Sequence, residues 1–298
     1  MATDQPFFSI VIPTYNRAGI IVKSIQTVLS QTFSNIEVLV VDDGSTDNTR
    51  EVVGALTDPR IKYHWKENAE RGAARNYGAL IARGRFVNFL DSDDLLYPHH
   101  LQTAFDFIAT NPACDVFHLG FDIKDELGRL VRNTTPIRSI NDEILSGNVL
   151  SCNGVFVKKE VAEANRFSED RQLSGLEDWE LWIRLCSKFV FLHDNRITST
   201  IIQHSNRSVM ETDASKITTK VDRFVAIACA NTNNRTTFGK RLNLTQASAW
   251  TYAALHLSLS GQGKGSALRY LIKGLRANPA EIWKARFFVI VKNLVTTY

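Results

Sequence analysis

Short apolar runs alternate with helical repeats along the first 95 residues of the chain. The runs are almost continuously apolar, as expected for strands that are buried on both faces of a sheet. They occupy residues 7–12, 36–41, 61–65 and 86–90. The segments between them repeat apolar positions at helical spacing, with Ser45 as a plausible N-cap for the second; these segments are residues 20–29, 46–56 and 72–82. The alternation predicts an α/β fold with a Rossmann-like, mostly parallel sheet flanked by helices.

The rest of the chain is less regular until its last third. Residues 99–108 and 179–186 have helical spacing, residues 116–123 form an apolar run, and a turn is expected at residues 126–129. From about residue 214 the pattern is helical to the end. We therefore expect one α/β domain over residues 1–210 and a helical C-terminal extension over residues 211–298.

Polar loops follow three of the predicted strands. They are residues 13–16, 42–45 and 91–94. Right-handed crossovers bring the carboxyl ends of parallel strands to one edge of a sheet, and ligands bind at that edge. Three such loops on one edge favour a binding site over three unrelated turns.

The loop after the fourth strand carries three carboxylates, Asp91, Asp93 and Asp94. Carboxylates packed at the end of a buried strand repel one another and lose solvation, which a divalent cation compensates. Hard oxygen ligands select Mg²⁺ or Mn²⁺, and a metal held in this way commonly binds phosphate. The alternative is an aspartate-rich loop that caps the next helix.

Composition and charge limit the class of protein. Apolar residues make up 44% of the 298 residues, charged residues make up 22%, and the net charge is +4. This is too weakly basic for a nucleic-acid-binding arm, but it suits an anionic small molecule or membrane surface. The first residues show neither the basic nor the apolar region of a signal peptide, so we expect none, and no apolar run reaches the roughly 18 residues of a membrane span. The four cysteines form no CxxC pair. We expect a cytoplasmic protein that binds no nucleic acid.

The ordered set of motifs resembles family 2 of the inverting glycosyltransferases, which share the A-type nucleotide-sugar-binding fold. The resemblance covers residues 7–208. The matching pieces are residues 9–16, 29–32, 41–47, 72–76, 89–94 and 177–179, followed by His204, Asn206 and Ser208.

The resemblance implies a nucleotide-diphosphate sugar as the donor, most readily one linked to UDP or dTDP. Asp43 would accept a hydrogen bond from the N3–H of uracil or thymine, and Pro13 and Tyr15 would form the wall of the base pocket. The alternative for the aspartate is a turn around Gly44. Arg75 would reach the base or the phosphates, or else form a surface salt bridge.

The resemblance also implies a metal, Mn²⁺ or Mg²⁺. Asp93 would bind it, Asp91 would contact the ribose or the sugar, and Asp94 would orient its neighbours or cap the next helix. His204 would complete the metal shell or contact the diphosphate, although a lone histidine is as often structural.

Inversion requires one general base opposite the leaving group. Asp178 is our candidate because it begins a helix, whose dipole favours the ionised carboxylate; Glu177 is its rival. Trp179 and Trp182 would pack beneath the base or line the acceptor site. The alternative is that Asp178 only caps the helix and that the tryptophans belong to the core.

These expectations describe a metal-dependent inverting glycosyltransferase, involved in polysaccharide biosynthesis, that acts on a saccharide or lipid-linked acceptor. A nucleotidyltransferase would need a glycine-rich loop after the first strand, and residues 13–17 contain no glycine. A sugar-nucleotide-binding module without turnover would need no base. The C-terminal segment, residues 280–295, is apolar with interspersed cations, which suits peripheral contact with the inner face of the membrane or packing on protein. The oligomeric state stays open.

Overall fold

The computed structural model describes residues 5–203, 213–260 and 263–296, and the chain forms two compact units. The first unit is built from the described parts of Met1–Ile140, Leu150–Glu169 and Phe189–Ser205, and the second from those of Asn141–Val149, Asp170–Lys188 and Asn206–Tyr298. The second unit thus includes two segments that precede the helical extension. The expected boundary at residue 210 stays a prediction.

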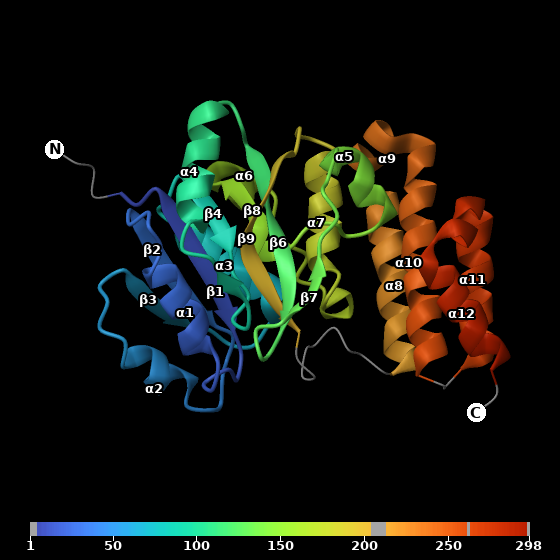
Figure 1. The fold of residues 1–298 in the computed structure, drawn as a ribbon, viewed down its shortest axis with the longest axis horizontal. Coiled ribbons are helices and arrows are strands. Elements are labelled where there is room, and N and C mark those ends of the chain that lie inside the picture. Colours follow the sequence, from blue (N-terminus) through green and yellow to red (C-terminus); the bar gives the residue numbers. More distant parts are fainter. Residues whose placement is uncertain (1–4, 204–212, 261–262, 297–298) are drawn as a thin grey trace. The chain divides into compact units, whose positions relative to one another are not determined.

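The first unit contains a nine-stranded sheet (Figure 1). The strands are β1 (Phe8–Thr14), β2 (Ile36–Asp42), β3 (Ile61–Trp65), β4 (Phe86–Phe89), β5 (Leu95–Leu96), β6 (Val116–Asp125), β7 (Leu130–Asn133), β8 (Val155–Lys158) and β9 (Leu192–Gln203). Their order is β3-β2-β1-β4-β8-β6-β9-β5, with β7 paired to β6. The first four strands pair in parallel, β8 is antiparallel to both β4 and β6, and β6 is parallel to β9. The expected Rossmann-like α/β fold is confirmed.

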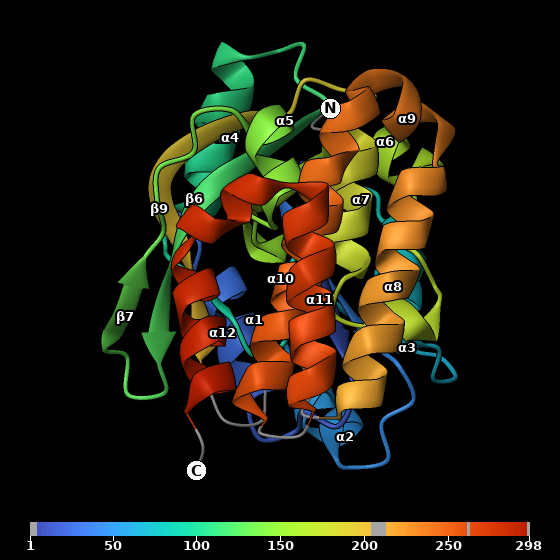
Figure 2. The same cartoon turned by 90° about the vertical axis from the view of Figure 1, so that its right-hand side faces the viewer.

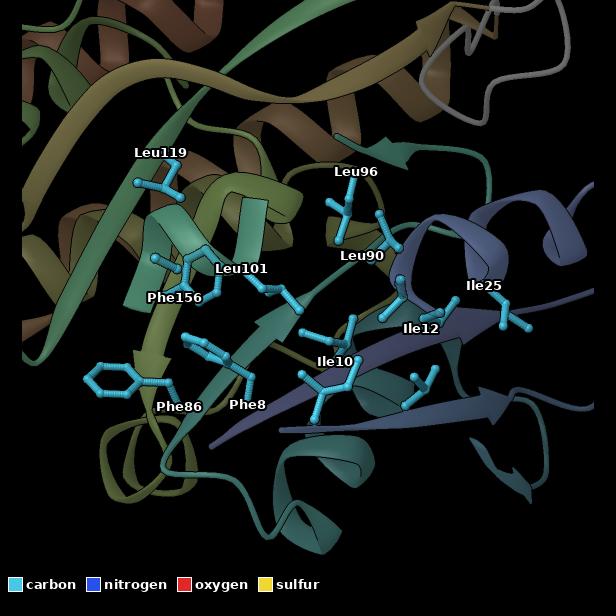
Figure 3. Packing of buried hydrophobic residues seen from close by; sticks show 14 of the residues in the cluster. Phe8, Ile10, Ile12, Ile25, Phe86, Leu90, Leu96, Leu101, Leu119 and Phe156 are labelled. Atoms are coloured by element: carbon cyan, nitrogen blue, oxygen red, sulfur yellow. The ribbon is translucent and has the colours of Figure 1, made fainter. Parts of the chain in front are cut away.

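Two-residue periodicity in β1 explains how helices come to cover both faces of the sheet. Phe8, Ile10 and Ile12 point to one face and are fully buried in a cluster with residues of α1 (Ile21–Leu29) and α4 (His100–Thr110) (Figure 3). Val11 points to the opposite face, against α3 (Glu70–Ile81). Gly78 of α3 allows this close approach, because any side chain there would collide with Val11.

The helices of the first half lie where the sequence pattern placed them, with one correction. The expected helix over residues 46–56 is the shorter α2 (Thr49–Gly54), preceded by Asn48 without a side-chain cap. Ser45 is therefore not its N-cap: the Ser45 hydroxyl oxygen instead accepts a hydrogen bond from the backbone N–H of Asn16, at 2.8 Å. The loop after β2 takes up residues that the helical spacing had assigned to the helix. The other short elements here are η2 (Cys152–Gly154) and α6 (Lys159–Ala164).

The second unit is helical (Figure 2). Its elements are α5 (Ile140–Glu143), which begins at the boundary, η1 (Ile144–Ser146), η3 (Arg171–Leu173), α7 (Glu177–Cys186), α8 (Ala214–Ala230), α9 (Thr232–Phe238), η4 (Gly239–Arg241), α10 (Leu242–Leu259), α11 (Lys264–Ala277), η5 (Pro279–Trp283) and α12 (Ala285–Val295). Helix α10 packs against α8, α11 and α12, which explains why it is apolar around most of its circumference. No helix among the described residues is both long and apolar enough to cross a membrane.

Candidate functional site

Two strand-end loops of the first unit are held together by Asn16. Its backbone has a φ of 52°, in the left-handed region that asparagine tolerates better than most residues. Its side-chain Oδ1 accepts hydrogen bonds from the backbone N–H groups of Thr46, at 2.8 Å, and Asp47, at 3.3 Å. The loop after β1 is thereby bound to the loop after β2. The sequence showed Asn16 as part of a motif, but not this clamp.

The adjacent aspartates after β2 have different roles. Asp42 is fully buried, and its carboxylate accepts hydrogen bonds from the backbone N–H of Ser45, at 2.7 Å, and from the hydroxyl of Tyr63, at 2.5 Å. Burial raises the pKa of Tyr63, and the hydrogen bond to Asp42 raises it further. The turn at Gly44, which has a φ of 84°, is therefore built on Asp42. The neighbouring Asp43 is not needed for that turn.

The carboxylate of Asp43 points instead to the segment that follows β3. Its Oδ1 accepts hydrogen bonds from Lys66 Nζ, at 2.6 Å, and from the backbone N–H of Ala69, at 3.0 Å. Pro13 is buried in β1 opposite Val41 of β2, whereas Tyr15 is 48% exposed. Lys66 was missed in the sequence, where it stood only as a cation just beyond the third strand.

The three carboxylates after β4 converge. Their oxygens lie within 4.8 Å of one another, and Asp94 is the most buried of the three residues. Asp94 Oδ1 accepts a hydrogen bond from the backbone N–H of Ile202, at 3.0 Å, on β9. Helix α4 starts several residues later, after His99, without a side-chain cap. The alternative that this loop caps the next helix is therefore wrong, and so is the capping role considered for Asp94.

Two arginines neutralise part of this negative charge. Arg75 is almost fully buried in α3, and its Nη2 lies 2.6 Å from Asp91 Oδ1. Its guanidinium also lies over the ring of Phe167, 5.1 Å from the centroid, so the surface salt bridge considered for Arg75 is wrong. Arg17 Nη2 is 3.8 Å from Asp93 Oδ2. Sequence reasoning missed Arg17, although it directly follows the first motif.

The donor atoms at this edge fit a hard divalent cation. Three carboxylates from one turn offer oxygen ligands within a span of 4.8 Å, at the carboxyl ends of parallel strands. Asp91 and Asp93 keep some solvent access, with side-chain exposures of 25% and 13%. His204, the other expected ligand, lies outside the described residues. Ile202, two positions before it, is bound to the cluster through Asp94.

The candidate bases lie in the second unit, at the start of α7. Glu177 is buried, and its Oε2 accepts a hydrogen bond from the backbone N–H of Gly175 at 2.5 Å. Asp178 is partly exposed, and its oxygens accept hydrogen bonds from the backbone N–H of Trp179, at 2.6 Å, and from Asn148 Nδ2, at 3.0 Å. The residue at the capping position is Leu176, so Asp178 does not serve as the N-cap.

The two tryptophans that follow are core residues of the second unit. Trp179 donates its indole N–H to the carbonyl of Ile144, at 2.8 Å, and stacks on Phe224 with ring centroids 4.5 Å apart. Trp182 is completely buried. The expectation that they line an acceptor site is wrong, because both indoles are covered by protein.

The sequence matches the model of glycosyl transferase family 2 over residues 9–158. Glycosyltransferase GlyG of Streptococcus pneumoniae is 26% identical over 223 residues, which are 69% of this chain and 73% of that protein. An uncharacterised glycosyltransferase of Rickettsia felis is 35% identical over 191 residues, covering 60% of this chain and 30% of its own length. The chain similarly spans 28% and 31% of two further rickettsial relatives.

Two solved structures share the fold over most of their length. Staphylococcus aureus TarS 1–349, in complex with UDP-GlcNAc, has a TM-score of 0.59 and 19% identity, covering 93% of this chain and 91% of TarS. The mannosyltransferase PcManGT of Pyrobaculum calidifontis, in complex with GDP-Man and Mn²⁺, has a TM-score of 0.62 and 18% identity, covering 98% and 87%. These likenesses confirm the expected A-type fold with a helical C-terminal part.

Proposed function

This chain belongs to glycosyl transferase family 2, and we propose that it transfers a sugar from a nucleotide-diphosphate donor to a hydroxyl of a saccharide or lipid-linked acceptor, with inversion. The observation that carries this proposal is the carboxylate cluster of Asp91, Asp93 and Asp94 beside the clamped loops after β1 and β2. Fold neighbours hold UDP-GlcNAc and GDP-Man, so nucleotide sugars as a class suit this fold.

The loops after β1 and β2 would bind the nucleoside. Asp43 would accept the N3–H of a uracil or thymine ring, which favours a UDP- or dTDP-linked donor. Tyr15 is exposed enough to stack on the base, and the buried Pro13 would complete the wall of the pocket. Lys66 fixes the Asp43 carboxylate by a 2.6 Å contact and adds positive charge near an anionic ligand.

The cluster after β4 would hold Mn²⁺ or Mg²⁺, with Asp93 as its main ligand and His204 as a further one. When bound, the cation neutralises charge that develops on the departing nucleoside diphosphate. Arg75 fixes the orientation of Asp91 toward the ribose or sugar through their 2.6 Å ion pair. Arg17, which already reaches Asp93, would contact the phosphates.

Asp178 would act as the general base. It would take the proton from the acceptor hydroxyl while that oxygen attacks the anomeric carbon, and the bond from this carbon to the diphosphate oxygen would break on the opposite side. Asp178 suits this task better than Glu177 because Glu177 is buried and bonded to the backbone of Gly175. One displacement then inverts the configuration, without a covalent intermediate.

The C-terminal segment would bring the enzyme to a lipid-linked acceptor at the inner face of an anionic membrane. Trp283 and Phe288 have exposures of 79% and 59%, whereas Ile290 is fully buried, so α12 packs on protein and still presents apolar side chains to solvent. Neither α11 nor α12 contains an acidic residue. Exposed apolar groups among cations suit the surface of an anionic bilayer.

A panel of nucleotide sugars tests the function, with Mn²⁺-dependent hydrolysis and thermal stabilisation as readouts. We expect at least one UDP- or dTDP-sugar to stabilise the protein and to be hydrolysed slowly, and a chelator to abolish both effects. Stabilisation without hydrolysis or transfer would favour a binding module without turnover. The absence of both for every donor would overturn the proposal.

A further inference from the structure

Both oxygens of the Asp178 carboxylate accept a hydrogen bond within the second unit. The backbone N–H of Trp179 lies 2.6 Å from Oδ1, and the side-chain amide of Asn148 lies 3.0 Å from Oδ2. The first donor belongs to the same helix and fixes the position of one oxygen. The second donor comes from a segment 30 residues earlier in the chain. The rotation of the carboxylate therefore depends on where that segment lies.

Asn148 stands in a short loop that the helical extension holds in place. The carbonyl of Ser146, two residues before it, accepts a 2.7 Å hydrogen bond from the hydroxyl of Ser248 on α10. It also accepts one from Lys284 Nζ, at 3.4 Å. Arg286 of α12 donates to the same Ser248 hydroxyl, at 3.0 Å. Three side chains of the C-terminal extension thus converge on the start of this loop.

A buried carboxylate fixes the two cations of this network. Glu281 is completely buried, and its oxygens lie 2.6 Å from Lys284 Nζ and 3.4 Å from Arg286 Nε. The hydroxyl of Thr251 on α10 donates to the same carboxylate, at 3.0 Å. Burying such a set of charges is costly, and apolar residues of similar size would commonly be at least as stabilising. The network does reach the Ser146 carbonyl, directly through Lys284 and by way of Ser248 through Arg286.

We propose that Asn148 is a positioning residue for Asp178 and that the helical extension acts on catalysis through the contact of Ser248 with the Asn148 loop. The inference rests on the proposed role of Asp178 as general base. Because the acceptor hydroxyl must meet one carboxylate oxygen in line with the attack, rotation of the carboxylate lowers the rate while leaving the donor site intact.

A kinetic double-mutant cycle on the full chain tests the connection. We expect Asn148→Ala to lower kcat about tenfold and Ser248→Ala about threefold, as for the loss of positioning rather than of the base itself. The donor KM should change little in either variant. Because Ser248 acts through the loop, its substitution should have almost no further effect once Asn148 is alanine. Asn233→Ala, an exposed asparagine on α9, is the matched control.

The outcomes separate this inference from the proposed function. If Asp178→Asn abolishes turnover while Asn148→Ala retains it, the role of Asp178 as general base is supported and the positioning role of Asn148 is overturned. Independent effects of the two alanine substitutions would overturn the connection through Ser248. If Asp178→Asn keeps near-normal turnover, the proposed base itself is wrong.

NMR spectroscopy tests the same contacts without a substrate, so it can be used even if no donor is found. The side-chain amide signal of Asn148 in a ¹⁵N–¹H NMR spectrum, assigned by its loss in Asn148→Ala, should shift in Asp178→Ala and in Ser248→Ala. The Asn233 signal should stay in place. If the chemical shift of the Asn148 side-chain amide is unchanged in both variants, the proposal is overturned.

Discussion

The carboxylates at the sheet edge and the carboxylate at the start of α7 are held by different kinds of contact in the structure. At the edge, Asp43, Asp91 and Asp93 each lie within 4 Å of a cationic nitrogen, from Lys66, Arg75 and Arg17 respectively. At the start of α7, Asp178 accepts hydrogen bonds from neutral amides. The cations at the sheet edge also attract phosphate, whereas the two amides orient the Asp178 carboxylate by hydrogen bonding.

This difference matches the tasks proposed for the two regions. A donor site has to hold an anionic diphosphate and a cation together, so alternating charges suit it. A general base has to meet the acceptor hydroxyl in the right orientation, and hydrogen bonds from the two amides orient the Asp178 carboxylate. Substitutions in the two regions should therefore affect different kinetic steps.

The largest effect is expected at the sheet edge. Asp93→Ala should abolish metal-dependent donor binding, because it removes the proposed main ligand from the cluster. Calorimetry with the nucleoside diphosphate and Mn²⁺ measures this directly, and Asp106→Ala, which removes an exposed carboxylate on α4, is the control. Unchanged affinity in Asp93→Ala would contradict the metal assignment.

At the start of α7 the loss should be confined to turnover. Asp178→Asn should lower kcat by about 10²-fold or more, as for the loss of a general base, with donor affinity intact. Steady-state rates and calorimetry on the same protein samples separate the two effects. Near-normal turnover in Asp178→Asn together with its loss in Glu177→Gln would assign the base to Glu177 instead.

Glu37 offers a comparison outside both regions, because this carboxylate lies at the amino end of β2, away from the site. Burial raises its pKa, but hydrogen bonds from Lys62, Ser9 and the backbone N–H of Arg83 lower it more, and the net shift is downward from 4.5. A lowered pKa in the folded state gives stability that is present above the unfolded value and is lost as the pH falls through the folded value.

Glu37→Gln should therefore lower the free energy of unfolding at pH 7 by about 1–3 kcal/mol, as for losing hydrogen bonds to a charged group. The variant should also lose less stability than the parent protein as the pH falls from above 4.5 to well below it. Urea denaturation across this range measures both effects. Glu126→Gln, in an exposed turn, is the control, and parallel pH profiles for Glu37→Gln and the parent protein would refute the structural role.

The smallest effect is expected at the surface of the second unit. The double substitution Trp283→Ser and Phe288→Ser should reduce flotation with anionic vesicles severalfold, with little effect on neutral ones, because exposed apolar side chains and cations act together there. Point substitutions are preferable to truncation near Pro279, since Glu281 and Ile290 beyond it are buried. Leu127→Ser, at an exposed apolar position of the first unit, is the control, and equal recovery of all forms would rule out the membrane contact.

The sequence by itself determined the α/β fold, the polar loops at the sheet edge and the family. The periodicity of a strand or a helix can be recognised in a short stretch of sequence. In a parallel sheet with right-handed crossovers, the carboxyl ends of the strands then lie at one edge whatever the side chains are. The cluster of Asp91, Asp93 and Asp94 could therefore be placed from its position after an apolar run. Ser45 was misassigned because helical spacing continued into the loop that Asn16 holds.

Only the tertiary structure decided which groups surround each carboxylate. From the sequence, Arg75 could contact the donor or form a surface salt bridge, and only the structure shows it buried against Asp91 and Phe167. Asn148 and Asp178 are 30 residues apart, and no local pattern joins them. Hydrophobic periodicity reports which face of an element is buried, but a contact between distant side chains depends on how whole elements pack, and no short window of sequence contains that information.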